Sequence, residues 1–308
     1  MSESSVATPV PPPSESSPPE GSRLAVTVIE AGPGEAAVGM FNSVPWHDLW
    51  NYRELFWIFA LRDLKVRYKQ TIAGVGWVLF QPILSTLMFL LLLNVLQVPV
   101  AGNTAEDVKQ GSLVLMILSG VVLWRLFAQT IQQGSESIVS NQSLVTKVYF
   151  PRLILPASPI LSGLVDLAVG VGLILLLKLW FPSHTGWQIL AAPLFVAWLT
   201  LLGLGAGLWL AALNTLYRDV RQIVPFFLQL WFFLSPVIYP LENIPVRWQW
   251  LYACNPTVGP LEGFRWALLG TPAPAIWSLV ASLFWTGLLL VTGAGYFRRV
   301  ERRFADWI

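Results

Sequence analysis

One stretch of this sequence restricts the possible folds more than any other. Residues 62–71, RDLKVRYKQT, place five charged side chains within eight positions, whereas residues 74–95, GVGWVLFQPILSTLMFLLLLNV, contain none. A helix needs about 20 apolar residues to cross the roughly 30 Å hydrocarbon core of a bilayer. The uncharged run is long enough, so it predicts a transmembrane helix with a charged segment at its entrance.

The composition of the whole chain agrees with a membrane protein. Hydrophobic residues make up 55% of the 308 residues and charged residues only 12%, whereas about 25% of the residues of soluble domains are charged. The apolar residues fall into separate runs of membrane-spanning length. We therefore predict an all-α integral membrane protein with six transmembrane helices, at about 74–98, 112–132, 160–180, 187–213, 221–239 and 276–297.

The distribution of positive charge predicts the orientation of these helices. Fourteen of the 19 Lys and Arg residues lie before the first span, in alternate loops and after the last span, and four lie on the opposite side. Cytoplasmic loops are enriched in Lys and Arg. Both termini are therefore expected on the cytoplasmic side of the cytoplasmic (inner) membrane, and residues 62–71 are expected to stop the chain there before its first crossing.

The chain before the first span divides into two segments. Residues 1–45 begin with a Ser- and Pro-rich tract that cannot bury a core, and we expect a disordered tail. Residues 46–70 predict an amphipathic interface helix, with Trp57 on its apolar face, partly sunk among lipid headgroups. An ordinary amphipathic surface helix is the alternative. Residues 74–308 are the predicted transmembrane domain.

A re-entrant segment is predicted between the fifth and sixth spans. Residues 241–275 are fairly apolar, but Pro256, Gly259, Pro260 and Gly263 interrupt them. Neither half is long enough to cross the hydrocarbon core as a helix. Non-helical backbone at membrane depth needs protein or a water-filled cavity to satisfy it. We expect two short half-helices that re-enter from the outer side, and a plain external loop is the alternative.

The sequence lacks the reactive constellations of an enzyme. Its two histidines, His47 and His184, fall on opposite sides of the membrane in this topology, and Cys254 is the single cysteine. It contains no phosphate-binding loop, no GxSxG and no HExxH motif. The glycines of GLGAG, residues 203–207, lie inside a span, where small residues four apart give helices a close-packing surface. We therefore expect no enzyme activity and no metal site on this chain.

Two ionisable residues lie inside the predicted spans. Arg125 and Asp166 are each about 10 Å from the inner boundary of the membrane, at 1.5 Å per residue. Charges at this depth are costly, and they usually pair across neighbouring helices. We expect an Arg125–Asp166 ion pair. Snorkelling of Arg125 to the interface and a proton relay through Asp166 are the alternatives.

Aromatic residues are concentrated in two places. In the loop 140–156 they accompany Lys147 and Arg152, a combination that suits either lipid headgroups or a docking partner. The fifth span is aromatic over much of its length. This suits packing or contact with lipid, and it also suits the path of a long amphipathic substrate whose sugars stack on aromatic rings. The aromatic residues concerned are Phe226, Phe227, Trp231, Phe232, Phe233 and Tyr239.

Five motifs, in this order, give the chain a family resemblance. They are LRDLKVRYKQTIAGVGW, NQSLVTKVYFPRLILP, NTLYRDVRQIV, LSPVIYP and NPTVGPLEGFRWALLG. Over about residues 45–308 the chain resembles the transmembrane subunits of polysaccharide-exporting ABC transporters, the ABC-2-type permeases that export O-antigen, capsule and teichoic-acid chains. The resemblance implies the permease subunit of an ATP-driven exporter of lipid-linked polysaccharide. An ABC-2-type exporter of another lipid or of a drug, an ion-coupled flippase and a membrane-embedded transferase are the alternatives.

The resemblance also implies the partners of the chain. The permease would be a homodimer among membrane lipids, bound to two copies of a separate ATPase subunit. That ATPase would carry ATP and Mg, with no cofactor on this chain and no nucleic acid. The residues implied in ATPase coupling are Arg62, Asp63, Lys65, Arg67, Lys69, Lys147, Phe150 and Arg152. The residues implied in an outer gate are Asn255, Pro256, Glu262 and Arg265.

Overall fold

The fold was analysed in a computed structural model, which describes residues 52–69, 74–95, 111–147, 150–181, 186–239 and 244–301. All of these residues belong to one unit of the chain, Pro45–Ile308. The predicted tail, 1–45, and the first residues of the predicted interface helix lie outside the described residues. All regular structure in the described ranges is helical, and five helices are long and apolar enough to cross a membrane. The predicted all-α class is therefore confirmed.

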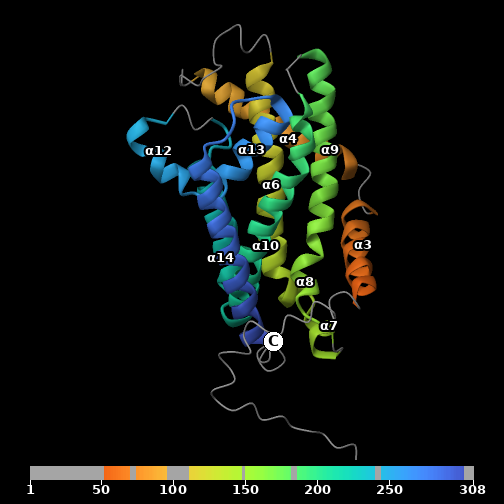
Figure 1. Cartoon of the computed structure of the whole chain (residues 1–308). Helices are drawn as coiled ribbons and strands as arrows, with labels where there is room; N and C mark the ends of the chain where they lie inside the picture. The colour runs from red at the N-terminus through yellow and green to blue at the C-terminus, as the bar shows by residue number, and fades with distance from the viewer. Residues whose placement is uncertain are drawn as a thin grey trace, which may run out of the picture. The chain divides into compact units, whose positions relative to one another are not determined.

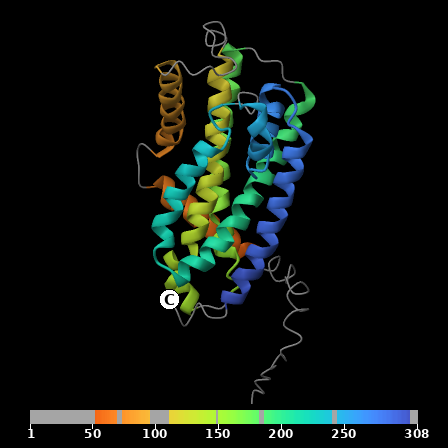
Figure 2. The same cartoon turned by 90° about the vertical axis from the view of Figure 1, so that its left-hand side faces the viewer.

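The five long helices are the candidate membrane spans. Four of them, α6, α9, α10 and α14, run side by side in both views of the molecule (Figures 1 and 2). They lie close to the predicted spans, although α6 continues past its predicted end at 132. The five helices are α4 (Gly74–Val95), α6 (Ser112–Ser140), α9 (Pro159–Trp180), α10 (Ala192–Leu216) and α14 (Ile276–Glu301).

The helix in the region of the fifth predicted span, α11 (Val220–Leu234), is shorter than the sequence pattern suggests. Its 15 residues extend about 22 Å, less than the roughly 30 Å of a bilayer core. Proline disfavours helical backbone at the residue before it, and Ser235 precedes Pro236. Ser235 accordingly takes an extended conformation, with φ −106° and ψ 148°, and the helix ends there.

Short helices mark the two ends of the long ones (Figure 1). At one end, called here the α7–α8 end, lie α7 (Gln142–Lys147) and α8 (Ile154–Ala157). At the other, called the α12–α13 end, lie α12 (Val246–Ala253) and α13 (Val258–Leu269). The remaining short elements are α3 (Arg53–Lys69), which packs against α8 and α9, and the 3-10 helix η1 (Trp187–Ala191).

The central helix is α6. Most of its residues between Leu113 and Ile138 are buried, and it packs against α4, α8, α9, α10, α11 and α13. A helix that is hydrophobic all round belongs in the interior of a bundle. Of the other long helices, α4, α9 and α10 pack around α6, and α14 packs against α10.

Glycines bring α10 close to two other helices. A Cβ atom at Gly203 would meet the side chains of Phe127 and Thr130 on α6 at 3.2–3.3 Å. On another side of α10, a Cβ at Gly205 would lie 2.8 Å from the backbone of α14, and a Cβ at Gly293 of α14 would lie 2.5 Å from the carbonyl oxygen of Gly205. The predicted packing role of the GLGAG motif is therefore confirmed.

A second hydrophobic cluster holds α3 and the segment around α7 and α8 on the bundle. Phe59 of α3 and Phe150 are both buried, and their ring centroids lie 5.8 Å apart. Ile138 of α6 and Phe297 of α14 belong to the same cluster. Trp57, on the predicted apolar face of α3, remains 53% exposed. The helix therefore docks through Phe59 and keeps Trp57 available to its surroundings.

Candidate functional site

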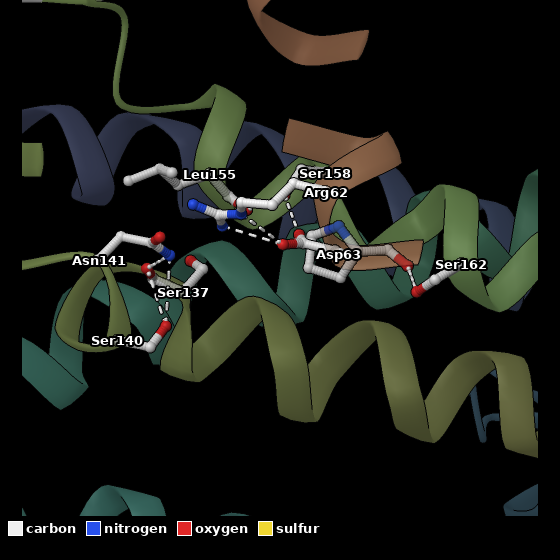
Figure 3. A network of polar contacts seen from close by, with 9 residues as sticks. Arg62, Asp63, Ser137, Ser140, Asn141, Leu155, Ser158 and Ser162 are labelled. Carbon is white, nitrogen blue, oxygen red and sulfur yellow. Dashed lines mark hydrogen bonds and ion pairs between the residues drawn. The ribbon is translucent and has the colours of Figure 1, made fainter. Parts of the chain in front are cut away.

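The first polar tie between α3 and the bundle is made by Asp63. Its carboxylate accepts a hydrogen bond of 2.9 Å from the Ser158 hydroxyl, at the start of α9, and forms an ion pair of 2.9 Å with Arg62. Figure 3 shows Asp63 between these two side chains. In the same view, the Asn141 amide donates to the Ser137 carbonyl at 2.8 Å, at the end of α6. Asp63 thus connects α3 to α9.

The second tie lies further along α9, at Asp166. Its Oδ2 atom forms an ion pair of 2.6 Å with Arg67, and its Oδ1 atom accepts a hydrogen bond from the Tyr68 hydroxyl. The Asp166 side chain is only 10% exposed. Burial, and then the hydrogen bond to Asp166, raise the pKa of Tyr68 to about 12. The phenol therefore keeps its proton at neutral pH and remains a donor.

The predicted Arg125–Asp166 ion pair is wrong, because Arg67 occupies the carboxylate. Arg125 instead donates from Nη2 to the Gln81 side-chain oxygen on α4, at 2.7 Å. No sequence pattern indicated the observed pairing, since it depends on which side of the bundle α3 packs against. The expected pairing of a charge at this depth with a neighbouring element still holds for Asp166.

The segment between α7 and α8 is tied to the end of α14. The Arg152 guanidinium donates to the Glu301 carbonyl oxygen at 2.6 Å, and the Arg152 backbone N–H donates to the Glu301 carboxylate at 3.2 Å. Phe150 is buried against Phe59. Phe150 and Arg152, two of the residues predicted for ATPase coupling, therefore contact α3 and α14 of their own chain.

The coupling residues divide into two groups by exposure. Asp63, Arg67, Phe150 and Arg152 make the contacts described above inside the chain. Lys65 and Lys147 are exposed, and the Arg62 side chain is 39% exposed beside its ion pair. The side chain of Lys69 lies outside the described residues. The exposed cations are open to a partner, and the other group connects α3 and the segment before α8 to α9 and α14.

An aromatic groove of about 370 Å³ lies between α4, α6 and α11. The ring of Phe232 on α11 stacks on Phe89 of α4, with centroids 5.4 Å apart, and meets Trp124 of α6 edge-on at 5.6 Å. Two amides, Gln132 and Gln229, supply hydrogen-bonding groups. The groove is lined by Phe89, Trp124, Ala128, Gln132, Pro225, Leu228, Gln229, Phe232 and Phe233.

The predicted channel aromatics point in different directions. Trp231 packs edge-on against Phe127 of α6, with centroids 5.5 Å apart, so it helps to fix α11 to the bundle. Phe226, Phe227 and Phe233 are 64%, 52% and 53% exposed. Phe232 lines the groove, and Tyr239 lies beyond the end of α11, where it stacks edge-on with Tyr252. An amphipathic substrate or another protein surface can reach the exposed rings.

Asn255 is the centre of a polar cluster at the α12–α13 end. Its side-chain oxygen accepts from the Trp231 indole at 3.1 Å and from the Thr257 hydroxyl at 2.9 Å. Its amide donates to the Leu234 carbonyl and to the Ser235 hydroxyl, both at 3.1 Å. The cluster joins the end of α11 to the start of α13. Pro256 lies in the turn beside it.

Arg265 makes a second connection in this region. Its side chain is buried, and its guanidinium donates to the carbonyl oxygens of Pro236 at 2.7 Å and Val237 at 2.5 Å. These carbonyls belong to the non-helical segment after α11, so the cation satisfies backbone that has no helical partner. Lys178 of α9 donates to the Leu268 carbonyl at 2.6 Å, at the end of α13. Glu262 is half-buried on α13.

Across the described ranges, no three His, Cys, Asp or Glu side chains gather closely enough to hold a metal ion. The grouped polar residues instead connect helices to one another.

Sequence reasoning missed several of these connecting residues, namely Tyr68, Gln81, Ser158 and Glu301.

The fold and these connections describe a helical bundle of membrane-spanning length, and comparison with known proteins identifies its family. The ABC-2 type transporter family matches residues 54–269, more than half of the chain. The chain therefore belongs to the ABC-2 type transporter family, and the family resemblance predicted from the five motifs is confirmed.

Individual relatives are permease and transport proteins. The chain is 27% identical over 263 residues to the O-antigen export system permease protein RfbA of Myxococcus xanthus, covering 85% of this chain and 98% of that protein. It is 24% identical over 256 residues to a protein of the same name from Klebsiella pneumoniae, covering 82% and 94%. It is 25% identical over 213 residues to the polysialic acid transport protein KpsM of Escherichia coli, covering 68% and 79%.

Proposed function

We propose that this chain is the permease subunit of an ATP-driven exporter that moves lipid-linked polysaccharide, such as O-antigen, across the cytoplasmic membrane. The observation that carries this proposal is the similarity to an O-antigen export permease over 98% of that protein's length. A polysialic acid transport protein among the relatives supports a glycan substrate over a drug. The aromatic groove adds a surface with ring faces and amides, which suits the apolar faces and hydroxyls of sugars.

The finer topology is part of this proposal. Segment 220–239 would be a sixth span, in which α11 and the turn after it cross the membrane together. The pair α12 and α13 would re-enter from the outer side. The non-helical backbone after α11 is satisfied by Arg265, as backbone at membrane depth requires. The basic α7–α8 end and both termini would lie in the cytoplasm.

Energy would come from a separate ATPase subunit that holds ATP and Mg, because this chain has no phosphate-binding loop. Two ATPase copies would bind a homodimer of this chain through the exposed cations Arg62, Lys65 and Lys147. The predicted domain boundary at 70–74 would separate the interface helix from the transmembrane domain. Closure of the ATPases would push α3 and the segment around α7 and α8.

The ties inside the chain would transmit this push. Asp63 and Arg67 connect α3 to α9, and Arg152 connects the segment before α8 to α14. A movement of α3 would therefore be transmitted to α9 more directly than to α4, although α4 follows α3 in the sequence. Asp166 is engaged by two partners on α3, which argues against the proton relay of an ion-coupled flippase.

The glycan path would run between the two copies, along the exposed aromatic rings of α11. The outer gate would be the α12–α13 end, where Asn255, Pro256, Glu262 and Arg265 lie. The Asn255 cluster and Arg265 both fasten α13 to the segment after α11. Opening of the gate would require these hydrogen bonds to rearrange, since α13 cannot move away from α11 while they remain.

The experiment that tests the function is deletion of the gene in its own host, with the wild-type gene returned as the control. Loss of the chain is expected to remove a surface glycan and to accumulate its lipid-linked form on the cytoplasmic leaflet. An unchanged surface glycan, together with loss of another lipid or of a drug from the exported pool, would reject the glycan substrate and leave the family assignment intact.

A further inference from the structure

A group of charged side chains lies where α3, α4, α6 and α9 meet. It contains Arg67 of α3, Arg125 of α6 and Asp166 of α9, with Gln81 of α4 and Tyr68 as neutral partners. Arg125 is close enough to Arg67 and Asp166 to interact with both of their charges. Four helices, of which α3 and α4 are consecutive in the sequence, thus contribute to one electrostatic cluster.

The cluster has more positive than negative charge. Two guanidinium groups face a single carboxylate, and Arg67 already occupies that carboxylate. Within the described residues, the hydrogen-bond acceptor of Arg125 is the neutral Gln81 side-chain oxygen. The Nη1 atoms of both Arg67 and Arg125 are buried and have no hydrogen-bond partner in the part of the chain that the structure describes. Buried donors without acceptors are rare in proteins and costly.

The cluster is reached from the surface of the chain. Gln81 is exposed on α4, and the Arg67 side chain is 30% exposed. Arg67 lies on the same helix as the exposed Lys65 and the partly exposed Arg62, in the charged segment that precedes the first uncharged run. This segment marks the depth of lipid headgroups, since charged residues that border a span lie there. An anion at headgroup depth can therefore approach the two arginines past Gln81.

Phosphate is the anion whose chemistry matches this site. Guanidinium groups bind phosphate oxygens through paired, charge-assisted hydrogen bonds. Basic pockets between membrane helices on the cytoplasmic side bind lipid phosphates. We propose that Arg67 and Arg125 form a binding site for the phosphate group of a lipid headgroup, with Gln81 as the neutral acceptor that the phosphate displaces.

Two kinds of lipid carry this chemistry. One is a phospholipid of the surrounding bilayer, and the other is the diphosphate of a prenyl carrier that holds a glycan. The carrier alternative rests on the proposed function, whereas the phosphate site itself does not. The two alternatives share the same donors, so they are separated by experiment.

The experiment is native mass spectrometry of the full chain, purified in a phosphate-free maltoside detergent. The probes are phosphatidylglycerol and farnesyl diphosphate, and their matched controls without phosphate are diacylglycerol and farnesol. The wild-type chain is expected to retain at least one phosphate probe and neither control. R125Q is expected to weaken retention about tenfold, since it removes a charge-assisted hydrogen bond. R218Q, which removes an exposed cation between α10 and α11, is expected to leave retention unchanged.

A second variant distinguishes loss of the phosphate site from loss of folding, which R125Q alone does not separate. Q81E places a carboxylate beside Arg125, so the chain supplies the missing anion itself. This variant is expected to unfold at the same or a higher temperature than the wild type and to lose the phosphate probe. A folded Q81E chain that retains the probe as the wild type does would overturn the site.

The probes also identify the source of the phosphate. Displacement of phosphatidylglycerol by farnesyl diphosphate would identify the carrier, and the reverse order of preference would identify a bilayer phospholipid. Retention of farnesol and diacylglycerol equal to that of the phosphate probes, or equal weakening by R125Q and R218Q, would overturn the proposal. Because these measurements involve no ATPase and no export, a result that overturns the phosphate site would leave the proposed export function untouched.

Discussion

The Arg67–Asp166 ion pair gives the sharpest prediction about how α3 is held. In D166N, the amide keeps an oxygen for the Tyr68 hydroxyl but loses the charge that pairs with Arg67 at 2.6 Å. Removing one partner from a fully buried pair costs about 3–5 kcal/mol. Asp166 is 10% exposed but the Arg67 side chain is 30% exposed, so the expected loss is smaller, about 2 kcal/mol.

The assay is reversible unfolding of the full chain in mixed micelles, with the free energy of unfolding as the readout. The double-mutant cycle of R67Q and D166N isolates the pair, and its coupling energy is expected to be at least about 1 kcal/mol. D219N is the matched control, because Asp219 is exposed and makes no side-chain capping bond at the start of α11. A cycle that is additive, or a D166N chain as stable as D219N, would refute the tie.

Three further predictions concern other contacts. G293V places a Cβ where it would lie 2.5 Å from a carbonyl oxygen of α10. The free energy of unfolding of this variant should therefore fall by about 1–3 kcal/mol. The control is G287V, whose added Cβ meets nothing within 4 Å and which should leave the same free energy nearly unchanged. N255A removes the Asn255 partner of an indole, a backbone carbonyl and two hydroxyls. It should therefore lower the same free energy by about 1–3 kcal/mol. Stability equal to that of the wild type would contradict a stabilising role for the Asn255 cluster. K65E/K147E should fold normally but reduce copurification of the partner ATPase about tenfold, as reversed charges at an interface do; unchanged recovery of the ATPase would remove these lysines from the interface.

The long helices were predicted well from the sequence because the length of an apolar run is a strong local signal. The predicted span at 74–98 contains α4, Gly74–Val95, and the glycines of 203–207 pack where their spacing indicated. The end of α11 was missed although its signal was visible, since Pro236 disfavours helix at Ser235. The predicted span, 221–239, continued past this residue.

The polar connections could not be predicted, because they depend on how helices dock. Asp166 was expected to find an arginine, but both Arg67 and Arg125 were within reach in principle. The choice is decided by the burial of Phe59, which places the Arg67 side of α3 against α9. The Glu301 contact of Arg152 depends equally on tertiary packing, since the two residues are 149 positions apart in the sequence.

The most direct measurement of the proposed role is transport in proteoliposomes that contain this chain with its partner ATPase and a lipid-linked glycan. Glycan transfer to the opposite leaflet is expected only when the ATPase and ATP are both present, and is expected to fall in D166N while ATP hydrolysis continues. Transfer by this chain alone, without the ATPase or nucleotide, would contradict a permease that is moved by a separate energy-supplying subunit.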